Sequence, residues 1–225
     1  MNWTQEYTKA VTFSYDDGNR QDIHLIELLN AYNLKCTFNL NSGLGENDIW
    51  QYEGIPVQRL NLEKCVSLYK GHEIAVHGSR HLNPLELSPE ELHHEFADDK
   101  AELTRIFGTE PIGMAYAYGC YNDKVIAEIE SLGLRYGRTT QPSYNFDVQS
   151  DLLRFRPTCH HDDENLFGLV ERFLKLNAKE PQILYIWGHS YEPDGKRNWD
   201  RIERIFEMLA NKPDIFYGTN AEVLL

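Results

Sequence analysis

The sequence predicts an α/β fold in which seven or eight βα units close into a barrel. Short runs rich in β-branched and aromatic residues alternate with longer amphipathic stretches over all 225 residues, a pattern typical of parallel strands joined by helices. No linker or low-complexity segment interrupts the alternation, which indicates one domain over residues 1–225. An open, doubly wound sheet is the alternative, because periodicity does not show whether a sheet closes.

The first half of the chain contains three apolar runs that predict strands and three amphipathic stretches that predict helices. The strands are Ala10–Tyr15, Lys35–Leu40 and Glu73–Val76, and the helices are Asp22–Tyr32, Leu60–Tyr69 and Ser88–Phe107. In the first helix Ile23, Ile26 and Leu29 are expected to face inward, with Leu25 joining them more loosely.

The third helix has the clearest start signal. Ser88 suits the capping position, Pro89 suits the first turn, and Glu91 stands where a capping box needs it.

The second half of the chain continues the alternation of strands and helices. Its expected strands are Gly113–Tyr118, Arg135–Thr139, Ile183–Trp187 and Ile215–Gly218, and its expected helices are Asp123–Leu132, Glu164–Leu176 and Arg197–Leu209.

The composition disfavours some classes of binding partner. Lys and Arg total 22 against 35 Asp and Glu, so the formal net charge is -13, which disfavours nucleic acid and anionic membranes. No apolar stretch resembles a secretory leader or a membrane span, which predicts a cytoplasmic protein without membrane insertion. The four cysteines form no C-x-x-C pair, so free thiols are expected.

Titratable residues follow three of the expected strands, at the end where parallel α/β folds carry their sites. Asp16 and Asp17 follow the first strand, although an Asp-Gly turn is the more common explanation when the pair is taken alone. His77 and His81 follow the third strand with a spacing that lets both imidazoles reach one ion if the segment turns helically. His189 follows the strand Ile183–Trp187. Three such groups together favour a catalytic site over coincidence.

Three sequence motifs resemble those of the polysaccharide deacetylase (NodB-homology, carbohydrate esterase family 4-like) family. They are Phe13-Ser14-Tyr15-Asp16-Asp17-Gly18, His77-Gly78-Ser79-Arg80-His81 and Ile186-Trp187-Gly188-His189, which match motifs one, two and five in order and spacing. The ending Phe216–Glu222 resembles the final strand and loop of that family, so the resemblance spans nearly the whole chain.

The resemblance implies a metal-dependent deacetylase on the distorted barrel of that family. It assigns Asp16 as general base, His189 as general acid, and Asp17, His77 and His81 as ligands of one divalent metal ion. Zinc suits two imidazoles and a carboxylate, but cobalt, nickel, manganese and iron accept the same donors. Tyr118 and Gly119 match the remnant of motif three, where a backbone N–H stabilises the oxyanion, and Trp187 is expected at the substrate.

The chain departs from the family at two motifs. The arginine of motif three, which orients the base, is absent, and Arg138 at the end of the strand Arg135–Thr139 is the expected substitute. Motif four has no clear counterpart; Asp147 and Asp151 are possible stand-ins for its aspartate, and one histidine of His160-His161 could face the site. We expect His93 and His94, which are adjacent on a helix, to be surface residues.

Aromatic residues near the expected strand ends could stack on sugar rings, although an aromatic core is the competing explanation. They are Tyr116, Tyr118, Tyr121, Trp187, Tyr191 and Trp199. The expected function is removal of acetyl groups from an N- or O-acetylated carbohydrate. The alternatives are hydrolysis of a small cyclic amide or ureide such as allantoin, and a non-catalytic carbohydrate-binding relative.

Overall fold

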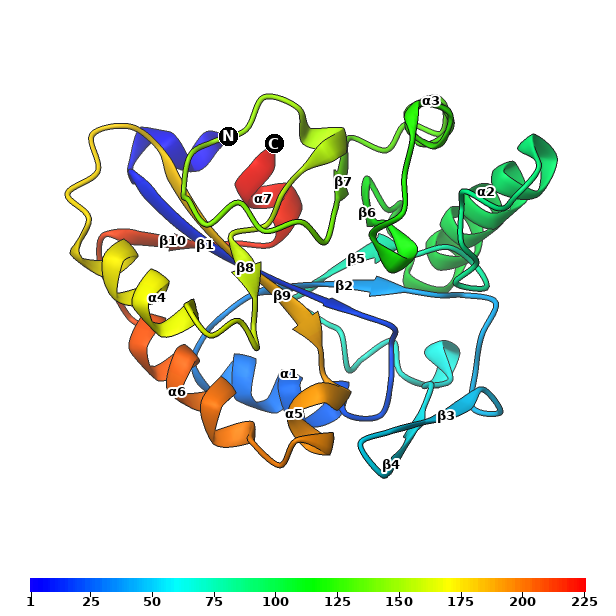
Figure 1. The fold of residues 1–225 in the computed structure, drawn as a ribbon, viewed down its shortest axis with the longest axis horizontal. Coiled ribbons are helices and arrows are strands. Elements are labelled where there is room, and N and C mark those ends of the chain that lie inside the picture. Colours follow the sequence, from blue (N-terminus) through cyan, green and yellow to red (C-terminus); the bar gives the residue numbers. More distant parts are fainter.

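The computed structural model describes all residues, 1–225, as a curled parallel sheet with helices around it (Figure 1). The sheet strands are β1 (Lys9–Asp16), β2 (Cys36–Leu40), β5 (Glu73–Val76), β6 (Gly113–Ala115), β7 (Tyr136–Arg138), β8 (Cys159–His160), β9 (Gln182–His189) and β10 (Ile215–Tyr217). The helices are α1 (Asp22–Ala31), α2 (Pro89–Phe107), α3 (Asp123–Ser131), α4 (Leu166–Lys175), α5 (Tyr191–Gly195), α6 (Trp199–Leu209) and α7 (Asn220–Leu224).

Strand β1 lies at the centre of the sheet. It pairs along its whole length with β9, from Lys9 opposite Gln182 to Asp16 opposite His189. On its other side the first half of β1 pairs with β10 and the second half with β2. The last residues of β1 and β9 therefore lie side by side at the carboxyl end of the sheet.

The sheet runs in the order β7-β6-β5-β2-β1-β9-β8, and one segment joins its two edges. Arg138 of β7 forms a parallel bridge with Phe155, and five residues further on His160 of β8 pairs with Trp187 of β9. The sheet thus curls into the distorted β/α barrel that the sequence predicts, and the open doubly wound alternative is wrong.

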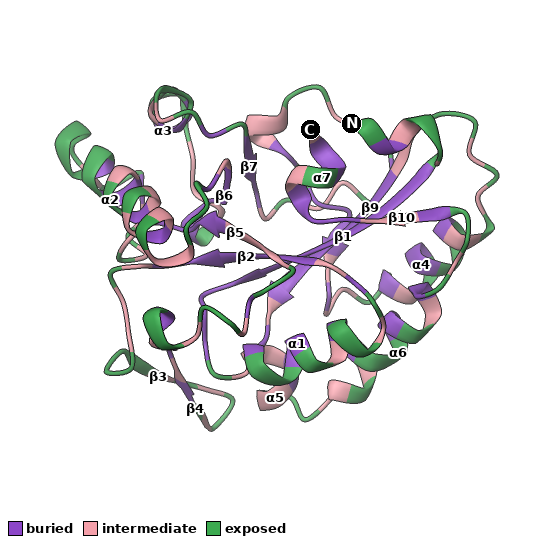
Figure 2. Ribbon diagram, turned by 180° about the vertical axis from the view of Figure 1, so that it is seen from behind, coloured by how far each residue is buried: buried purple, intermediate pink, exposed green.

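Helices shield the outside of the curled sheet. Figure 2 shows the central strands of the sheet buried and the helices as a mixture of buried and exposed residues. Helices α1, α4 and α6 lie along one side of the barrel (Figure 1), and the ring of Phe206 in α6 packs edge-on against Phe13 of β1 at 5.0 Å between centroids. None of the helices has the length and apolar content that crossing a bilayer requires.

Helix α2 begins as predicted. The Ser88 hydroxyl accepts a hydrogen bond from the Glu91 N–H, and the Glu91 carboxylate accepts one from the Ser88 N–H. In α1 the buried face consists of Leu25, Ile26 and Leu29, whereas Ile23 is 43% exposed. The inward position predicted for Ile23 is therefore wrong, and Leu25 is fully part of the buried face instead.

The predicted helix Leu60–Tyr69 is wrong: only Leu62–Lys64 forms a single 3-10 turn. The preceding residues are held by the loop that follows β1, because Arg59 bridges Asn19 and the Leu60 N–H donates to the Gly18 carbonyl at 2.8 Å. This tertiary pairing overrides the apolar pattern. The sequence also gave no sign of the antiparallel hairpin β3 (Ile49–Tyr52) and β4 (Ile55–Gln58).

Two further boundaries differ from expectation. Strand β6 ends at Ala115, three residues before the predicted end at Tyr118, and the chain turns into a 3-10 helix at Ala117–Gly119. The segment after β10, expected as a loop, forms α7, which a capping box between Thr219 and Glu222 starts.

Asp22 at the start of α1 is a fully buried acid with an elevated pKa. Burial raises its pKa to about 7, and side-chain hydrogen bonds with Ser190 and Tyr69 offset this only in part. The Ser190 oxygen lies 2.8 Å from Asn19 Oδ1 and 2.6 Å from Asp22 Oδ1. One hydroxyl proton cannot serve two acceptors, so the neutral form of Asp22, which donates to Ser190, satisfies all three groups.

Asp22→Asn is therefore expected to stabilise the protein increasingly as pH rises. The elevated folded pKa of Asp22 favours folding below pH 4, and this contribution is lost between pH 4 and about 7. The asparagine amide donates to Ser190 without titrating, so its advantage at pH 8 should reach up to about 4 kcal/mol. Urea unfolding of the variant and the wild type at pH 5 and pH 8 measures the difference in their free energies of unfolding, and the exposed Asp98→Asn serves as control. If this difference were the same at both pH values, the pKa of Asp22 would not be elevated.

Candidate active site

The carboxyl ends of β1, β5 and β9 bring the sequence-predicted side chains together. Asp16 is the last residue of β1, His77 follows β5 directly, and His189 is the last residue of β9. Consecutive side chains of a strand normally point to opposite faces. Asp17 has a left-handed backbone with φ 85°, which breaks this alternation and lets both carboxylates face the same centre.

The three residues expected as metal ligands converge. His77 Nε2 lies 3.9 Å and His81 Nε2 3.6 Å from Asp17 Oδ1, and the three ligand atoms all lie within 4.8 Å of one another. His77 Nδ1 is 2.8 Å from the Ala115 carbonyl oxygen, which can only accept a hydrogen bond. Nδ1 therefore carries the proton, and Nε2 presents its lone pair to the centre.

Both imidazoles are neutral at pH 7, as metal ligands must be. Burial lowers the pKa of His77 and lowers that of His81 to about 4, and these effects outweigh the attraction of Asp16 and Asp17. Two neutral imidazoles and an ionised carboxylate form a donor set that borderline divalent cations accept. The residues present therefore fit a divalent cation.

Asp16 lies beside this triad as an ionised carboxylate. Its Oδ1 accepts a hydrogen bond from Asn39 Nδ2 at 2.8 Å, and its Oδ2 accepts one from Arg138 Nη2. Burial alone would raise the Asp16 pKa, but the positive charges around it, above all that of Arg138, outweigh burial and lower it. The structure thus brings Arg138, expected to replace the arginine of motif three, against Asp16.

Arg138→Met is expected to lower the free energy of unfolding by about 3 kcal/mol, because it leaves the buried Asp16 without its counter-charge. Arg138 is 1% exposed, so solvent cannot replace the guanidinium. Urea unfolding measures the loss. The control is Arg156→Met, an exposed arginine that donates to Pro142, which should change stability by less than about 0.5 kcal/mol. Equal effects of both changes would contradict the assigned role of Arg138.

Arg59 is a site residue that the sequence did not reveal. Its Nη2 lies 3.1 Å from Asp17 Oδ1, and its Nη1 donates to the Asp17 carbonyl and to Asn41 Oδ1. The Arg59 charge, supported by that of His189, overcomes burial and lowers the Asp17 pKa. Arg59 belongs to no motif and lies 42 positions from Asp17, so only the tertiary structure shows the contact.

Helix α2 holds the loop that carries His77 and His81. Asp99 accepts hydrogen bonds from the N–H groups of His77 and Ser42, at 3.1 and 2.8 Å. Glu95 Oε1 accepts the N–H groups of Arg80 and Leu82, each at 3.0 Å. The backbone N–H groups of this loop are not paired within a helix, so the buried carboxylates accept the hydrogen bonds that water would otherwise accept.

His189 faces both aspartates. Its Nε2 is 3.8 Å from Asp16 Oδ2 and 4.0 Å from Asp17 Oδ2. Burial alone would lower the pKa of His189, but the Glu192 carboxylate and the two aspartates raise it to about 9. His189 is therefore protonated at neutral pH beside an ionised Asp16, the two protonation states that an acid and a base require.

The neighbourhood of His189 differs from expectation. Asp147 bridges Gln182, and Asp151 caps the turn Leu152–Arg154, so neither stand-in for the aspartate of motif four reaches His189. Both expectations are wrong. The carboxylate near His189 is Glu192, whose Oε2 lies 3.3 Å from Nδ1 and accepts the His189 N–H at 2.9 Å. Its spacing of three residues beyond His189 is a signal that the sequence did offer.

The expected aromatic rim is only partly present. Tyr116 is 1% exposed and its hydroxyl donates to the Leu153 carbonyl, so its predicted place in a substrate groove is wrong. Trp187 is 9% exposed, and its ring lies 4.3 Å from the guanidinium carbon of Arg138. Tyr118 is 65% exposed beside His81, at 4.6 Å between ring centroids.

The 3-10 turn that carries Tyr118 requires glycine next to it. A Cβ on Gly119 would lie 2.1 Å from Thr140 Oγ1, and the Gly119 N–H already donates to the Tyr116 carbonyl at 2.9 Å. Gly119 therefore shapes the turn, and its own N–H is engaged within it. Tyr191 packs against His189 and against Trp50 and Tyr52 of the β3–β4 hairpin.

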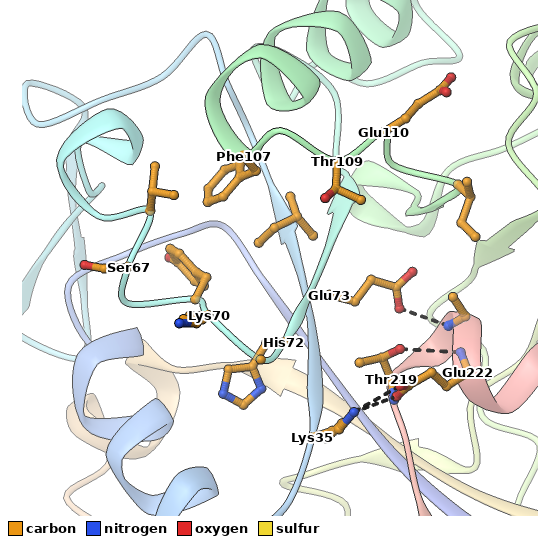
Figure 3. Close-up of a pocket in the computed structure, with 16 residues that line it drawn as sticks. Lys35, Ser67, Lys70, His72, Glu73, Phe107, Thr109, Glu110, Thr219 and Glu222 are labelled. Carbon is orange, nitrogen blue, oxygen red and sulfur yellow. Dashed lines mark hydrogen bonds and ion pairs between the residues drawn. The ribbon is translucent and has the colours of Figure 1, made fainter.

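A cavity of about 510 Å³ lies at the opposite end of the strands, where β2 and β5 begin (Figure 3). Three of its charged groups have partners: Lys35 pairs with Glu222 at 3.0 Å, and Glu73 accepts hydrogen bonds from Thr37 and the Ala221 N–H. No residue of the metal-binding triad lines it. It is separate from the candidate active site.

Comparisons with known proteins bear on the family and the fold of this chain. The sequence profile of the polysaccharide deacetylase family matches residues 5–137, more than half of the chain. YxkH of Bacillus subtilis, described as a polysaccharide deacetylase, is 27% identical over 139 residues, which are 60% of this chain and 46% of YxkH. The match thus spans about half the length of that relative.

Solved structures share the fold. A family 4 carbohydrate esterase of Streptomyces lividans, in complex with acetate, superposes with a TM-score of 0.60 at 16% identity over 94% of this chain and 93% of that one. A pseudoenzyme of the same family from Bacillus anthracis gives 0.61 at 14% identity over 97% of this chain and 66% of that one. With the profile match over more than half its length, the chain belongs to the polysaccharide deacetylase family.

Proposed function

We propose that this protein is a metal-dependent hydrolase that removes acetyl groups from an N- or O-acetylated carbohydrate. The observation that carries the proposal is the convergence of Asp17, His77 and His81 within 4.8 Å of one another, beside an ionised Asp16 and a protonated His189. The relative in complex with acetate supports the choice of acetyl group.

Asp17, His77 and His81 are the residues that would hold one divalent ion, with zinc as first choice and cobalt, nickel, manganese or iron as acceptable occupants. When bound, such an ion supplies Lewis acidity, which polarises an acetyl carbonyl and acidifies a nearby water. Arg59 holds Asp17 in its left-handed backbone conformation by binding both its carbonyl and its carboxylate.

Asp16 takes the proton of the attacking water. Arg138 keeps the carboxylate ionised and fixes its orientation together with Asn39. The Trp187 ring packs on the guanidinium of Arg138 and limits the movement of that guanidinium. A base held in this way needs no reorganisation at the moment of proton transfer.

His189 donates a proton to the leaving amine or alcohol. Its pKa of about 9 keeps it protonated at neutral pH, and Glu192 restrains its backbone through the hydrogen bond at 2.9 Å. A backbone N–H near Tyr118 serves the developing oxyanion, and the exposed Tyr118 ring offers a flat face to a sugar.

Acetate release from a panel of acetylated amide and ester saccharides, with metal content determined on the same sample, tests the proposal. Acetate from at least one saccharide and about one metal ion per chain at the Asp17 site are expected. Ring opening of a cyclic ureide without acetate release would instead support the alternative hydrolase. Saccharide binding without any turnover, unaffected by Asp16→Asn, would support a non-catalytic relative.

A further inference from the structure

A second group of potential metal ligands lies next to His189, outside the triad. It consists of His160, His161, Asp162 and Glu192, which we call the Glu192 cluster. One ligand atom from each residue lies within 4.8 Å of all the others. The residues come from the end of β8 and from helix α5, so the cluster joins two parts of the barrel rim.

His161 is the central observation. It is fully buried, and its Nε2 has no hydrogen-bond partner although it lies only 2.9 Å from Glu192 Oε2 and 3.6 Å from Asp162 Oδ2. The ring nitrogen is thus close to two carboxylate oxygens without pointing along a hydrogen bond to either. Leaving such a nitrogen unsatisfied is costly in a buried environment.

These spacings suit a shared cation. Ligands at about 2.0–2.2 Å from one ion lie about 2.8–3.6 Å from one another at the angles of octahedral and tetrahedral sites. The distance from His161 Nε2 to Glu192 Oε2 falls in this range, and that to Asp162 Oδ2 is near its upper limit. At the other ring nitrogen, His161 Nδ1 is 2.9 Å from the Tyr15 hydroxyl, an outer contact that fixes the orientation of the imidazole.

We propose that His161 Nε2, Asp162 Oδ2 and Glu192 Oε2 hold a second divalent cation, distinct from the one at Asp17, His77 and His81. One imidazole and two carboxylates would leave it near neutral charge. The cation would clamp β8 to α5 and so fix the backbone that carries His189.

Two residues next to the proposed site, His160 and Lys196, are not among its ligands. His160 Nδ1 accepts the Asp162 N–H at 3.2 Å, which leaves the proton of its neutral ring on Nε2, where it faces Glu192 at 3.0 Å. His160 is therefore assigned as a hydrogen-bond donor and not as a ligand. Lys196 Nζ lies 2.5 Å from Asp162 Oδ2, but its side chain is 37% exposed and can move into solvent when a cation binds.

Zinc titration of the metal-stripped protein by calorimetry tests this site separately from the catalytic one. Wild-type protein is expected to bind two equivalents, Asp17→Ala one, and the double variant Asp17→Ala with His161→Gln none. His160→Gln is the matched control from the adjacent position and should retain the second equivalent, as should the exposed His94→Gln. Loss of the second equivalent in His160→Gln but not in His161→Gln would overturn the ligand assignment.

Variants at buried residues can misfold, so an independent measurement on the wild-type protein is needed. Anomalous diffraction at the zinc edge from zinc-soaked wild-type crystals should show a peak between His161 and Glu192. A peak only at Asp17, His77 and His81 would overturn the second site and leave the proposed hydrolase intact. A peak only at the Glu192 cluster would support the second site and contradict the proposed metal dependence of the hydrolase.

Discussion

Asp16→Asn is expected to lower kcat by at least about a hundredfold while the metal content stays unchanged, because it removes the proton acceptor but none of the three proposed ligands. Asparagine has nearly the same shape and can still accept the hydrogen bond from Arg138 through its amide oxygen. The loss should therefore appear in kcat more than in the binding of the acetylated substrate.

Steady-state acetate release and metal analysis of the same preparation measure this effect. Asp98→Asn, an exposed aspartate on α2 that pairs with His94, is the matched control and should keep full activity. Unchanged turnover in Asp16→Asn would remove Asp16 from the mechanism, and loss of metal in that variant would reassign it as a ligand.

Loss of the metal from the Asp17 triad is expected to abolish hydrolysis. His81→Ala removes one of three protein ligands, and the partial exposure of His81, with 18% of its side chain accessible, makes this the least disruptive change to the folded core. We expect zinc affinity at this site to fall at least about tenfold, in line with the effect of weakening a metal site, and activity to disappear at stoichiometric zinc.

Chelation of the wild-type protein followed by addition of zinc, cobalt or manganese provides the complementary measurement. Activity should vanish with the chelator and return with at least one of these ions. His94→Ala, which changes an exposed histidine on α2, should follow the wild type throughout. Full turnover in chelated, metal-free protein would contradict the proposed mechanism directly.

The part of the site that follows strand ends could be predicted from the sequence. Asp16, Asp17, His77 and His189 each stand directly beyond an apolar run, and parallel strands bring their carboxyl ends to one edge. The position of Arg138 in the site could be predicted for the same reason, because Arg138 is the last residue of β7. These inferences depend on local pattern and on a general property of the fold.

The supporting contacts could not be predicted, because they depend on tertiary pairing. Arg59 reaches Asp17 only because its segment pairs with the loop after β1, and the same pairing prevents Leu60–Tyr69 from forming a helix. The Glu192 cluster likewise needs β8 and α5 to meet at the barrel rim. Apolar periodicity carries no information on either contact.

The left-handed backbone of Asp17 has a consequence for engineering. Transplanting this centre onto another barrel by copying the motif residues alone would omit Arg59, which grips both the carbonyl and the carboxylate of Asp17. A graft must carry residues 59–60 together with residues 16–19. Otherwise the recipient is expected to relax into an ordinary extended strand, with its two acids pointing to opposite faces.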